Sequence, residues 1–213
     1  MIISHKYKFV FLHIPKTGGS SIAHEMMKMC GYVPNINHIP AEEFTLFKDL
    51  AKWGNSTDMP QHSNYGDLKR YLEDLNIDVN DYFVFTFVRN PWDWYVSSYE
   101  FGKLRYKQDK LDWAKPCADN DFETWIKTAF HKQQDYLYDQ INYIGKMENM
   151  EFHLEKIRQI LQTRIANVEL DKVKPSIINA NPHADYKTYY TEETKTLVAK
   201  RCYQIINDFH YEF

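Results

Sequence analysis

The sequence predicts an α/β fold of the P-loop-like kind, in which a short parallel β-sheet lies between layers of flanking helices. Residues 7–14 and 82–88 are two mostly apolar runs, typical of parallel strands that are buried on both faces. A polar turn and an amphipathic segment follow each run directly, and strands that alternate with helices build a three-layer fold. The chain has 213 residues, 44% of them hydrophobic, so a single domain over residues 1–213 has ample material for its core.

The first strand, at residues 7–14, leads into a helix expected over residues 18–30. Ile22, Met26 and Cys30 share one face of that helix, and Gly31 stands where a glycine C-cap is expected. Two further helices are expected at residues 40–51 and 65–75, because apolar side chains recur there at helical spacing. These side chains are Phe44, Phe47 and Leu50 in the first helix, and Leu68, Leu72 and Leu75 in the second.

The second strand, at residues 82–88, ends at Arg89, after which Asn90 can cap a helix and Pro91 can take its first position. This helix carries apolar residues at spacings of four and three: Trp92, Val96 and Tyr99.

The remainder of the chain predicts one more strand and three more helices. Asn120 and Glu123 fit a capping box for a helix whose apolar residues are Phe122, Trp125, Ile126 and Phe130. A short strand is expected at residues 141–144 and a helix at residues 149–161. The last helix begins near Thr191, with two glutamates in its first turn, and buries Val198, Cys202, Ile205 and Phe209.

Charge and cysteine content exclude several classes of protein. The formal net charge is -3 and the sequence pI is near 6.3, so no general basic field attracts nucleic acid or an anionic membrane. Residues 103–110 hold the only basic cluster, which suits either a solvated helix end or an anionic substrate. Three cysteines without metal-ligand spacing predict neither a disulfide framework nor a zinc site. The first residues match no leader peptide or membrane anchor, so we expect a cytoplasmic protein.

The turn after the first strand reads Pro-Lys-Thr-Gly-Gly-Ser-Ser, and it predicts a cradle for a phosphate-like group. Backbone N–H groups at a helix start attract anions, and Gly18 and Gly19 let the chain approach one closely. Lys16 adds a positive charge, and hydroxyls come from Thr17, Ser20 and Ser21. The turn is not the nucleotide-triphosphate P-loop, whose lysine follows the glycines. A plain glycine-containing turn is the alternative.

The turn after the second strand repeats this arrangement with an arginine. The Arg89 guanidinium suits a pair of anionic oxygens, and Ser97 lies eight residues later, just over two helical turns along. The pair can hold a second phosphate. Alternatively, Arg89 bridges Asp93 or caps a carbonyl. Two anion-binding turns on neighbouring strands suit a nucleoside with a phosphate at each end.

These two motifs resemble those of the sulfotransferases. "HIPKTGGSS" resembles the 5′-phosphosulfate loop of the cytosolic and Golgi-type enzymes, and "VRNPWDWYVSSY" is similar to their 3′-phosphate element, with Arg89 and Ser97 at the family's spacing. The carbohydrate O-sulfotransferase branch, which is related to the heparan-sulfate 2-O-sulfotransferases and includes small bacterial members, is the most similar. The resemblance implies sulfuryl transfer from 3′-phosphoadenosine 5′-phosphosulfate (PAPS) to a hydroxyl, with 3′-phosphoadenosine 5′-phosphate (PAP) as product and no metal.

The resemblance also implies roles for particular residues. Lys16 would offset charge on the leaving phosphate, the residues from Thr17 to Ser21 would bind the 5′ end, and Arg89 with Ser97 would hold the 3′-phosphate. His62 matches the family segment that carries a histidine base. His13 is a competing candidate, although a structural role suits it better. A carboxylate base is the other alternative, with candidates at Glu42, Glu43 and Asp58.

The stretch from residue 179 to residue 187 departs from the family's pattern, because Asn181 stands where relatives carry a hydroxyl or a cation. Tyr186 and Lys187 are expected to cover the adenine or the rest of the donor. We expect a carbohydrate acceptor, and the alternatives are a lipid, a small metabolite or a tyrosyl hydroxyl. Sugar rings can stack on aromatic residues, although a place in the core is the alternative for most of them: Trp92, Trp94, Tyr99, Trp113 and Trp125. The alternatives to a sulfotransferase are a kinase-like nucleotide phosphotransferase and a non-catalytic nucleotide- or glycan-binding module.

Overall fold

The computed structural model describes residues 1–32, 43–47, 56–57, 62, 64–137, 140–165, 168–175 and 182–213. The chain divides into two compact units, each made from two stretches of sequence. The first unit holds Met1–Val88 and Leu137–Asn179, and the second holds Arg89–Tyr136 and Ala180–Phe213. A single domain over residues 1–213 stays a prediction.

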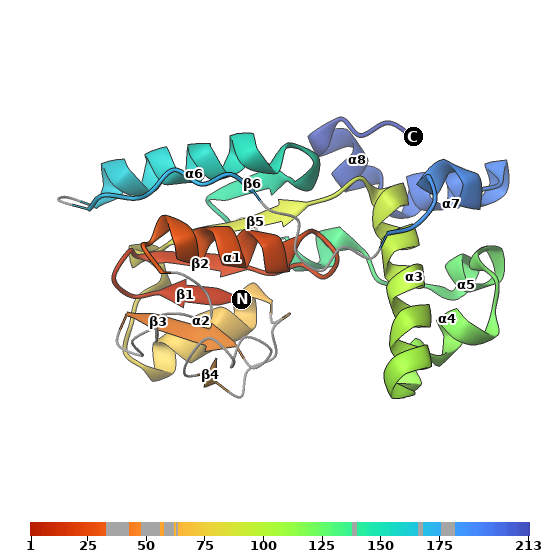
Figure 1. The fold of residues 1–213 in the computed structure, drawn as a ribbon, viewed down its shortest axis with the longest axis horizontal. Helices are drawn as coiled ribbons and strands as arrows, with labels where there is room; N and C mark the ends of the chain where they lie inside the picture. The colour runs from red at the N-terminus through yellow and green to blue at the C-terminus, as the bar shows by residue number, and fades with distance from the viewer. Residues whose placement is uncertain are drawn as a thin grey trace. The chain divides into compact units, whose positions relative to one another are not determined.

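A mixed β-sheet forms the centre of the first unit (Figure 1). Among the described residues it has six strands in the order β4-β3-β1-β2-β5-β6. Their bounds are Ile2–Ser4 (β1), Phe9–Leu12 (β2), Phe44–Phe47 (β3), Ser56–Thr57 (β4), Phe83–Val88 (β5) and Tyr143–Lys146 (β6). Strands β2, β5 and β6 pair in parallel, which confirms the three predicted strands, although β6 begins and ends two residues later than the expected 141–144. Strand β1 is antiparallel to both β2 and β3. The sequence analysis did not predict β1, β3 or β4.

One predicted helix is wrong. The segment from residue 40 to residue 51 was expected to be helical, yet Phe44–Phe47 is strand β3, in register with β1 through Ile2 and Leu46. A spacing of three apolar residues over so short a run fits either type of element, and pairing with β1 decides in favour of the strand. Residues 48–51 and 40–42 lie outside the described residues.

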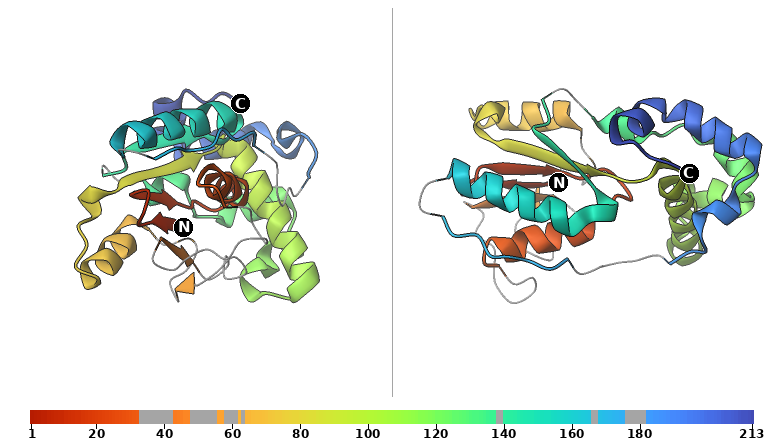
Figure 2. Two further views of the ribbon diagram at one scale, coloured as in Figure 1. Left: turned by 60° about the vertical axis from the view of Figure 1, so that its left-hand side comes forward. Right: turned by 90° about the horizontal axis from the view of Figure 1, so that it is seen from above.

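Helices cover both faces of this sheet, which gives the predicted three layers (Figure 2, right). Helices α1 (Gly19–Met29) and α6 (Met150–Arg164) pack on the face that carries Phe9, Phe11 and Phe85. Helix α2 (Tyr65–Asp74) packs on the opposite face, against Val10 and Val84. All residues of β2 and β5 are buried, because each strand is covered on both sides.

The ends of α1 and α2 follow from local sequence. At the C-terminus of α1, Gly31 has a φ of 82°, and the N–H of Tyr32 donates to the Met27 carbonyl at 2.9 Å. The predicted glycine cap is therefore confirmed. Asn64 and Asp67 form a capping box at the start of α2. Leu75, which was expected on the buried face of that helix, is 48% exposed and follows its end.

The second unit is helical in its described part. Its helices are α3 (Pro91–Asp109), α4 (Lys115–Asp119), α5 (Phe122–Thr128), α7 (Glu192–Arg201) and α8 (Tyr203–Phe209). Short 3₁₀ turns lie at Asp112–Ala114 (η3), Gln133–Tyr136 (η4) and Tyr186–Tyr189 (η6). Asn90 caps α3 and Pro91 is its first residue, as predicted.

Two details of the second unit correct the sequence analysis. Asp121, and not Asn120, caps α5, with its carboxylate accepting from the Thr124 N–H at 2.8 Å. Phe130 lies beyond this helix and is 74% exposed. The expected last helix is two helices, α7 and α8, which meet at the buried Cys202.

Candidate functional site

The turn between β2 and α1 has the backbone conformation of a short, tightly wound loop. Lys16 has a φ of 62° and Gly18 a φ of 78°, so two residues of the turn are left-handed. A left-handed lysine costs roughly 1 to 2 kcal/mol, and strain of this kind is typical of functional sites. Helix α1 begins at Gly19, and the N–H groups of its first turn have no acceptor within the helix. The turn therefore presents a lysine and a helix N-terminus together.

The two glycines of the turn are required for different reasons. Gly18 has a positive φ, and a Cβ there would lie 2.9 Å from the Cε of Met150. At Gly19 a Cβ would lie 1.8 Å from Nε2 of His13. The sequence analysis explained both glycines by the approach of an anion. The structure adds that Gly19 makes room for a buried histidine ring.

The hydroxyl groups of the turn differ in their exposure. Thr17 is fully buried, and its hydroxyl donates to the Ile14 carbonyl at 2.9 Å, which closes the turn on itself. Ser21 is also buried, and Ser20 is half-buried. The Thr17 hydroxyl therefore stabilises the turn, and Thr17 directly precedes Gly18, the N-cap of α1.

The structure places His62 beside this turn, next to His13. Nδ1 of His62 lies 3.0 Å from the His13 carbonyl oxygen, and the two rings meet edge to face with centroids 4.6 Å apart. Because a carbonyl oxygen can only accept, Nδ1 of His62 is the protonated nitrogen of the neutral ring. His62 is exposed, whereas His13 is 7% exposed.

His13 is held in its uncharged form by its surroundings. Burial lowers its pKa well below the ordinary value, and the N-terminal amino group, His62 and Lys16 lower the pKa further through charge repulsion. A buried histidine that resists protonation is a poor acceptor for a substrate proton. His13 is therefore the weaker of the two histidine candidates for the base.

Of the three alternative carboxylate bases, only Glu43 lies within the described residues. Its carboxylate pairs with Lys6 at 3.0 Å and accepts a hydrogen bond from the Tyr32 hydroxyl. Burial alone would raise the pKa of Glu43, but the hydrogen bonds from Tyr32 and Lys6 outweigh burial and lower the pKa. These contacts occupy the carboxylate, so it is a weaker candidate than His62.

In the second unit, Arg89 is paired with Asp93. Nε of Arg89 lies 2.7 Å and an Nη 2.6 Å from the same Asp93 oxygen, and the arginine side chain is 12% exposed. The bridge that the sequence offered as an alternative is thus present. Ser97 is buried and follows Asp93 by four residues on α3, so the two share a helix face. His183 lies on the other Asp93 oxygen, 3.5 Å away.

Gln133 is a residue of this region that the sequence analysis missed. It is fully buried, accepts from the Arg89 N–H at 2.8 Å, and donates to the Arg89 carbonyl at 2.8 Å. One side chain thereby satisfies both backbone groups of Arg89. The two residues are 44 positions apart, and no local pattern around Gln133 marks it.

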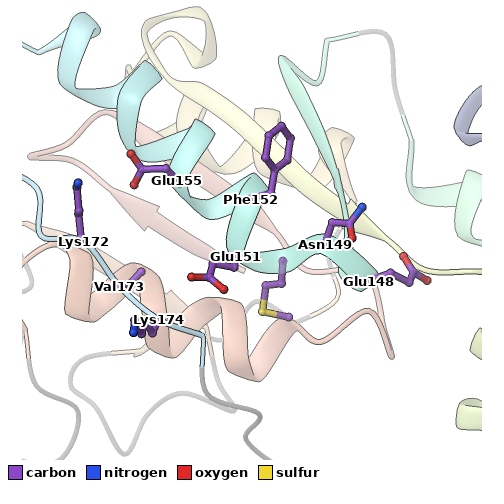
Figure 3. A pocket seen from close by; sticks show the side chains of 9 residues that line it. Glu148, Asn149, Glu151, Phe152, Glu155, Lys172, Val173 and Lys174 are labelled. Atoms are coloured by element: carbon purple, nitrogen blue, oxygen red, sulfur yellow. The ribbon is translucent and has the colours of Figure 1, made fainter.

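A cavity of about 810 Å³ lies in the first unit, at the start of α6 (Figure 3). Glu151 and Glu155 on α6 face the segment that carries Lys172 and Lys174. Met150 also lines the cavity and approaches Gly18, so the cavity adjoins the glycine turn. None of the predicted site residues lines it, and its mixed charges do not make an anion cradle.

The other predicted ligand contacts have varied placements. Asn179 and Asn181 lie outside the described residues. Tyr186 packs edge-on against Phe213, and Lys187 lies 5.8 Å over the same ring. Of the five aromatic residues proposed for sugar stacking, three are buried core residues: Trp92, Trp94 and Tyr99. Trp125 is half-buried, while Trp113 is 58% exposed and stacks on Phe101.

Within the described ranges, histidine, cysteine and acidic side chains form no group of three or more that could bind a metal ion. Among the described helices, none has the length and apolar character needed to cross a membrane.

Comparisons with known proteins agree with this architecture. A family model described as "Sulfotransferase family" matches residues 1–208. Among solved structures, the chain is similar to the mouse sulfotransferase SULT7A1 complexed with PAP, with a TM-score of 0.52 and 13% identity over 92% of this chain and 83% of that chain. At that identity the likeness concerns the fold. None of the curated protein sequences matches.

Proposed function

The chain belongs to the sulfotransferase family, and we propose that it transfers a sulfuryl group to a carbohydrate hydroxyl with His62 as the base. As a PAPS-dependent sulfotransferase, it uses a donor that supplies a sulfuryl group on a 5′-phosphate together with a 3′-phosphate. The acceptor oxygen forms a bond to sulfur, the bond from sulfur to the 5′-phosphate oxygen breaks, and the acceptor proton goes to the base. The products are a sulfate ester and PAP.

The observation that carries this proposal is the turn from Lys16 to Ser21. The Lys16 ammonium and the N-terminus of α1 both favour negative charge at this place, and the glycines let an anion approach the backbone closely. We assign the 5′ end of the donor to this turn, from Thr17 through Gly18, Gly19 and Ser20 to Ser21. The Lys16 ammonium stabilises the charge that develops on the departing phosphate.

His62 has the tautomer that a base requires. Its Nδ1–H donates to the His13 carbonyl, so the lone pair of the neutral ring is on Nε2. Histidine is the side chain that most often acts as a general base in proton transfer from a hydroxyl. Nε2 is therefore the atom to which we assign the acceptor proton.

Arg89 and Ser97 are assigned to the 3′-phosphate. Asp93 holds the Arg89 guanidinium through Nε and one Nη, and Gln133 holds its backbone. An arginine fixed on both sides is preorganised, which reduces the entropy lost when it binds an anion. In this assignment Asp93 orients Arg89 and does not merely neutralise it.

For the acceptor, the carbohydrate assignment rests on the resemblance of the two motifs to the carbohydrate O-sulfotransferase branch. Of the five aromatic residues considered for sugar stacking, Trp113 suits it best, because it is exposed and its ring is supported by Phe101.

Calorimetry with PAP and adenosine 5′-phosphate tests the donor assignment. The wild type is expected to bind PAP at least about a hundredfold more tightly, as two to three charged hydrogen bonds imply. Arg89→Ala removes this preference and Asp93→Asn weakens it. Arg105→Ala is the matched control, because Arg105 pairs with Asp109 on the same helix at 2.8 Å. Equal affinity of the wild type for both ligands contradicts the assignment, and tighter PAP binding by Asp93→Asn contradicts the orienting role.

A transfer screen with ³⁵S-labelled PAPS over glycans and small alcohols tests the reaction. Lys16→Ala is expected to lower transfer about 10² to 10³-fold, the usual loss for one group that stabilises developing charge. Lys8→Ala is its control, since Lys8 is also a left-handed lysine of the first unit. Labelling of non-carbohydrate alcohols alone overturns the carbohydrate assignment, and full activity of His62→Ala overturns the base.

A further inference from the structure

His13 contacts both parts of the proposed site in the first unit. Its ring lies against Gly19, where a Cβ would be 1.8 Å from Nε2, and so supports the start of α1. Its carbonyl oxygen accepts from Nδ1 of His62 at 3.0 Å, and its ring meets the His62 ring with centroids 4.6 Å apart. One residue therefore joins the anion-binding turn to the proposed base.

The ring of His13 is fixed from several sides. It stacks on Phe11 with centroids 5.8 Å apart and an angle of 22° between the planes, and it is 7% exposed. The titratable groups that act on it are the N-terminal amino group, His62 and Lys16, all of which lower its pKa. Burial and these neighbours therefore oppose protonation of the ring.

We propose that His13 is a positioning residue, which fixes His62 in the Nδ1–H tautomer and at a set place relative to the Lys16 turn. The proposal rests on the assignment of His62 as base. Its physical basis is that a neutral imidazole has two tautomers, and only the Nδ1–H form leaves Nε2 able to accept a proton. Because the backbone carbonyl selects this form, the packing of the His13 ring holds the selecting group in place.

Nitrogen NMR of the histidine rings reads the tautomer directly and needs no acceptor substrate. In the wild type at a pH where His62 is neutral, we expect the Nδ1–H form of His62. In His13→Ala, both tautomers are expected, because the ring that supports the carbonyl and meets the edge of His62 is gone. His13→Phe keeps a ring of similar size against Phe11 and Gly19, and is expected to keep the wild-type tautomer. His24→Ala, on α1, is the matched control.

Binding of PAP by calorimetry accompanies the NMR measurement. His13→Ala is expected to raise the Kd for PAP about tenfold, since the turn loses its support, and His13→Phe to change it less than about threefold. These effects separate positioning from general stability, because His62 can change tautomer in a protein that remains folded.

The proposal is overturned if neutral His62 of the wild type carries its proton on Nε2, or if folded His13→Ala keeps the wild-type tautomer. If His13→Ala does not fold, His13→Phe decides: loss of the Nδ1–H form in a folded His13→Phe overturns the packing argument. Failure of the proposed function looks different. In that case the wild type does not bind PAP, while the tautomer of His62 is still as expected.

Discussion

Replacement of Gly19 by alanine gives the sharpest test of how the turn is built. The new Cβ would lie 1.8 Å from Nε2 and 1.9 Å from Cδ2 of His13, whereas ordinary contact begins at 3.4 Å. The difference from the nearer atom, 3.4 minus 1.8, is 1.6 Å, so the His13 ring or the start of α1 must move. The ring cannot turn aside freely, because it stacks on Phe11 and meets His62.

We expect Gly19→Ala to lower the free energy of unfolding by about 3 kcal/mol, the upper end of the range for overpacking a filled site. For a chain of this length, that corresponds to a fall in Tm of roughly 6 to 12 °C. Gly31→Ala is the control. It places a Cβ in a left-handed position with nothing within 4 Å, so it carries only a backbone cost of roughly 1 to 2 kcal/mol.

Urea unfolding of the double variants separates the clash from other effects. Removal of the His13 ring makes room for the Cβ, so His13→Ala with Gly19→Ala should be more stable than the sum of the single changes predicts, by more than about 1 kcal/mol. His13→Ala with Gly31→Ala should be additive within about 0.5 kcal/mol, because those sites share no partner. Additivity in the His13 and Gly19 pair would refute the contact on which the reasoning depends.

Three further predictions follow from buried groups. Gln133→Ala removes the two hydrogen bonds that Gln133 makes to the N–H and carbonyl of Arg89, so the free energy of unfolding should fall by about 1 to 3 kcal/mol and PAP binding should weaken. Unchanged urea unfolding contradicts this. The pKa of His13 is lowered in the folded state, so the unfolded chain binds the extra proton and stability should fall as pH drops below about 6.5. His13 contributes up to roughly 1.4 kcal/mol per pH unit to this slope. Because burial also lowers the pKa of His5, His24 and His153, His13→Phe should reduce the slope without abolishing it, in unfolding curves measured at several pH values. Burial raises the pKa of the Cys117 and Cys202 thiols to about 11, and it raises the pKa of Cys30 as well. Iodoacetamide reacts with the thiolate, so at pH 8 it should modify these cysteines slowly in the native protein and fully in the unfolded protein.

Much of the fold was predictable because local sequence determines it. Strand β2 is a continuous apolar run, and β5 is interrupted only by Thr86. The glycine after α1 and the Asn-Pro start of α3 are local end signals. Where the sequence analysis was wrong, several local readings were equally good. Asn120 and Asp121 are adjacent, and both residue types can cap a helix. Only the structure shows that the Asp121 carboxylate accepts from the Thr124 N–H and so caps α5.

The candidate site likewise has one part that local sequence predicts and another part that it does not. The turn around Lys16 and the pair of Arg89 and Ser97 are local motifs whose residue types reveal their chemistry. The contacts that support them join residues far apart in the chain: 49 positions between His13 and His62, and 44 between Arg89 and Gln133. No periodicity or spacing in a single sequence encodes such a pairing, because nothing near Gln133 differs from an ordinary polar turn.

Because the motifs are local and the contacts that support them are long-range, some experiments test only the motifs and others test the structure. Loss of function in Lys16→Ala or Arg89→Ala would follow from the motifs alone, whatever the surrounding contacts are. Rescue of Gly19→Ala by His13→Ala has no reason in the sequence, since it requires the ring to lie where an alanine Cβ would be. From the sequence, Gly19 was expected to let the backbone approach an anion closely. If His13→Ala restores the stability of Gly19→Ala without restoring PAP binding, Gly19 both makes room for the His13 ring and lets the ligand approach, and these are two separate effects.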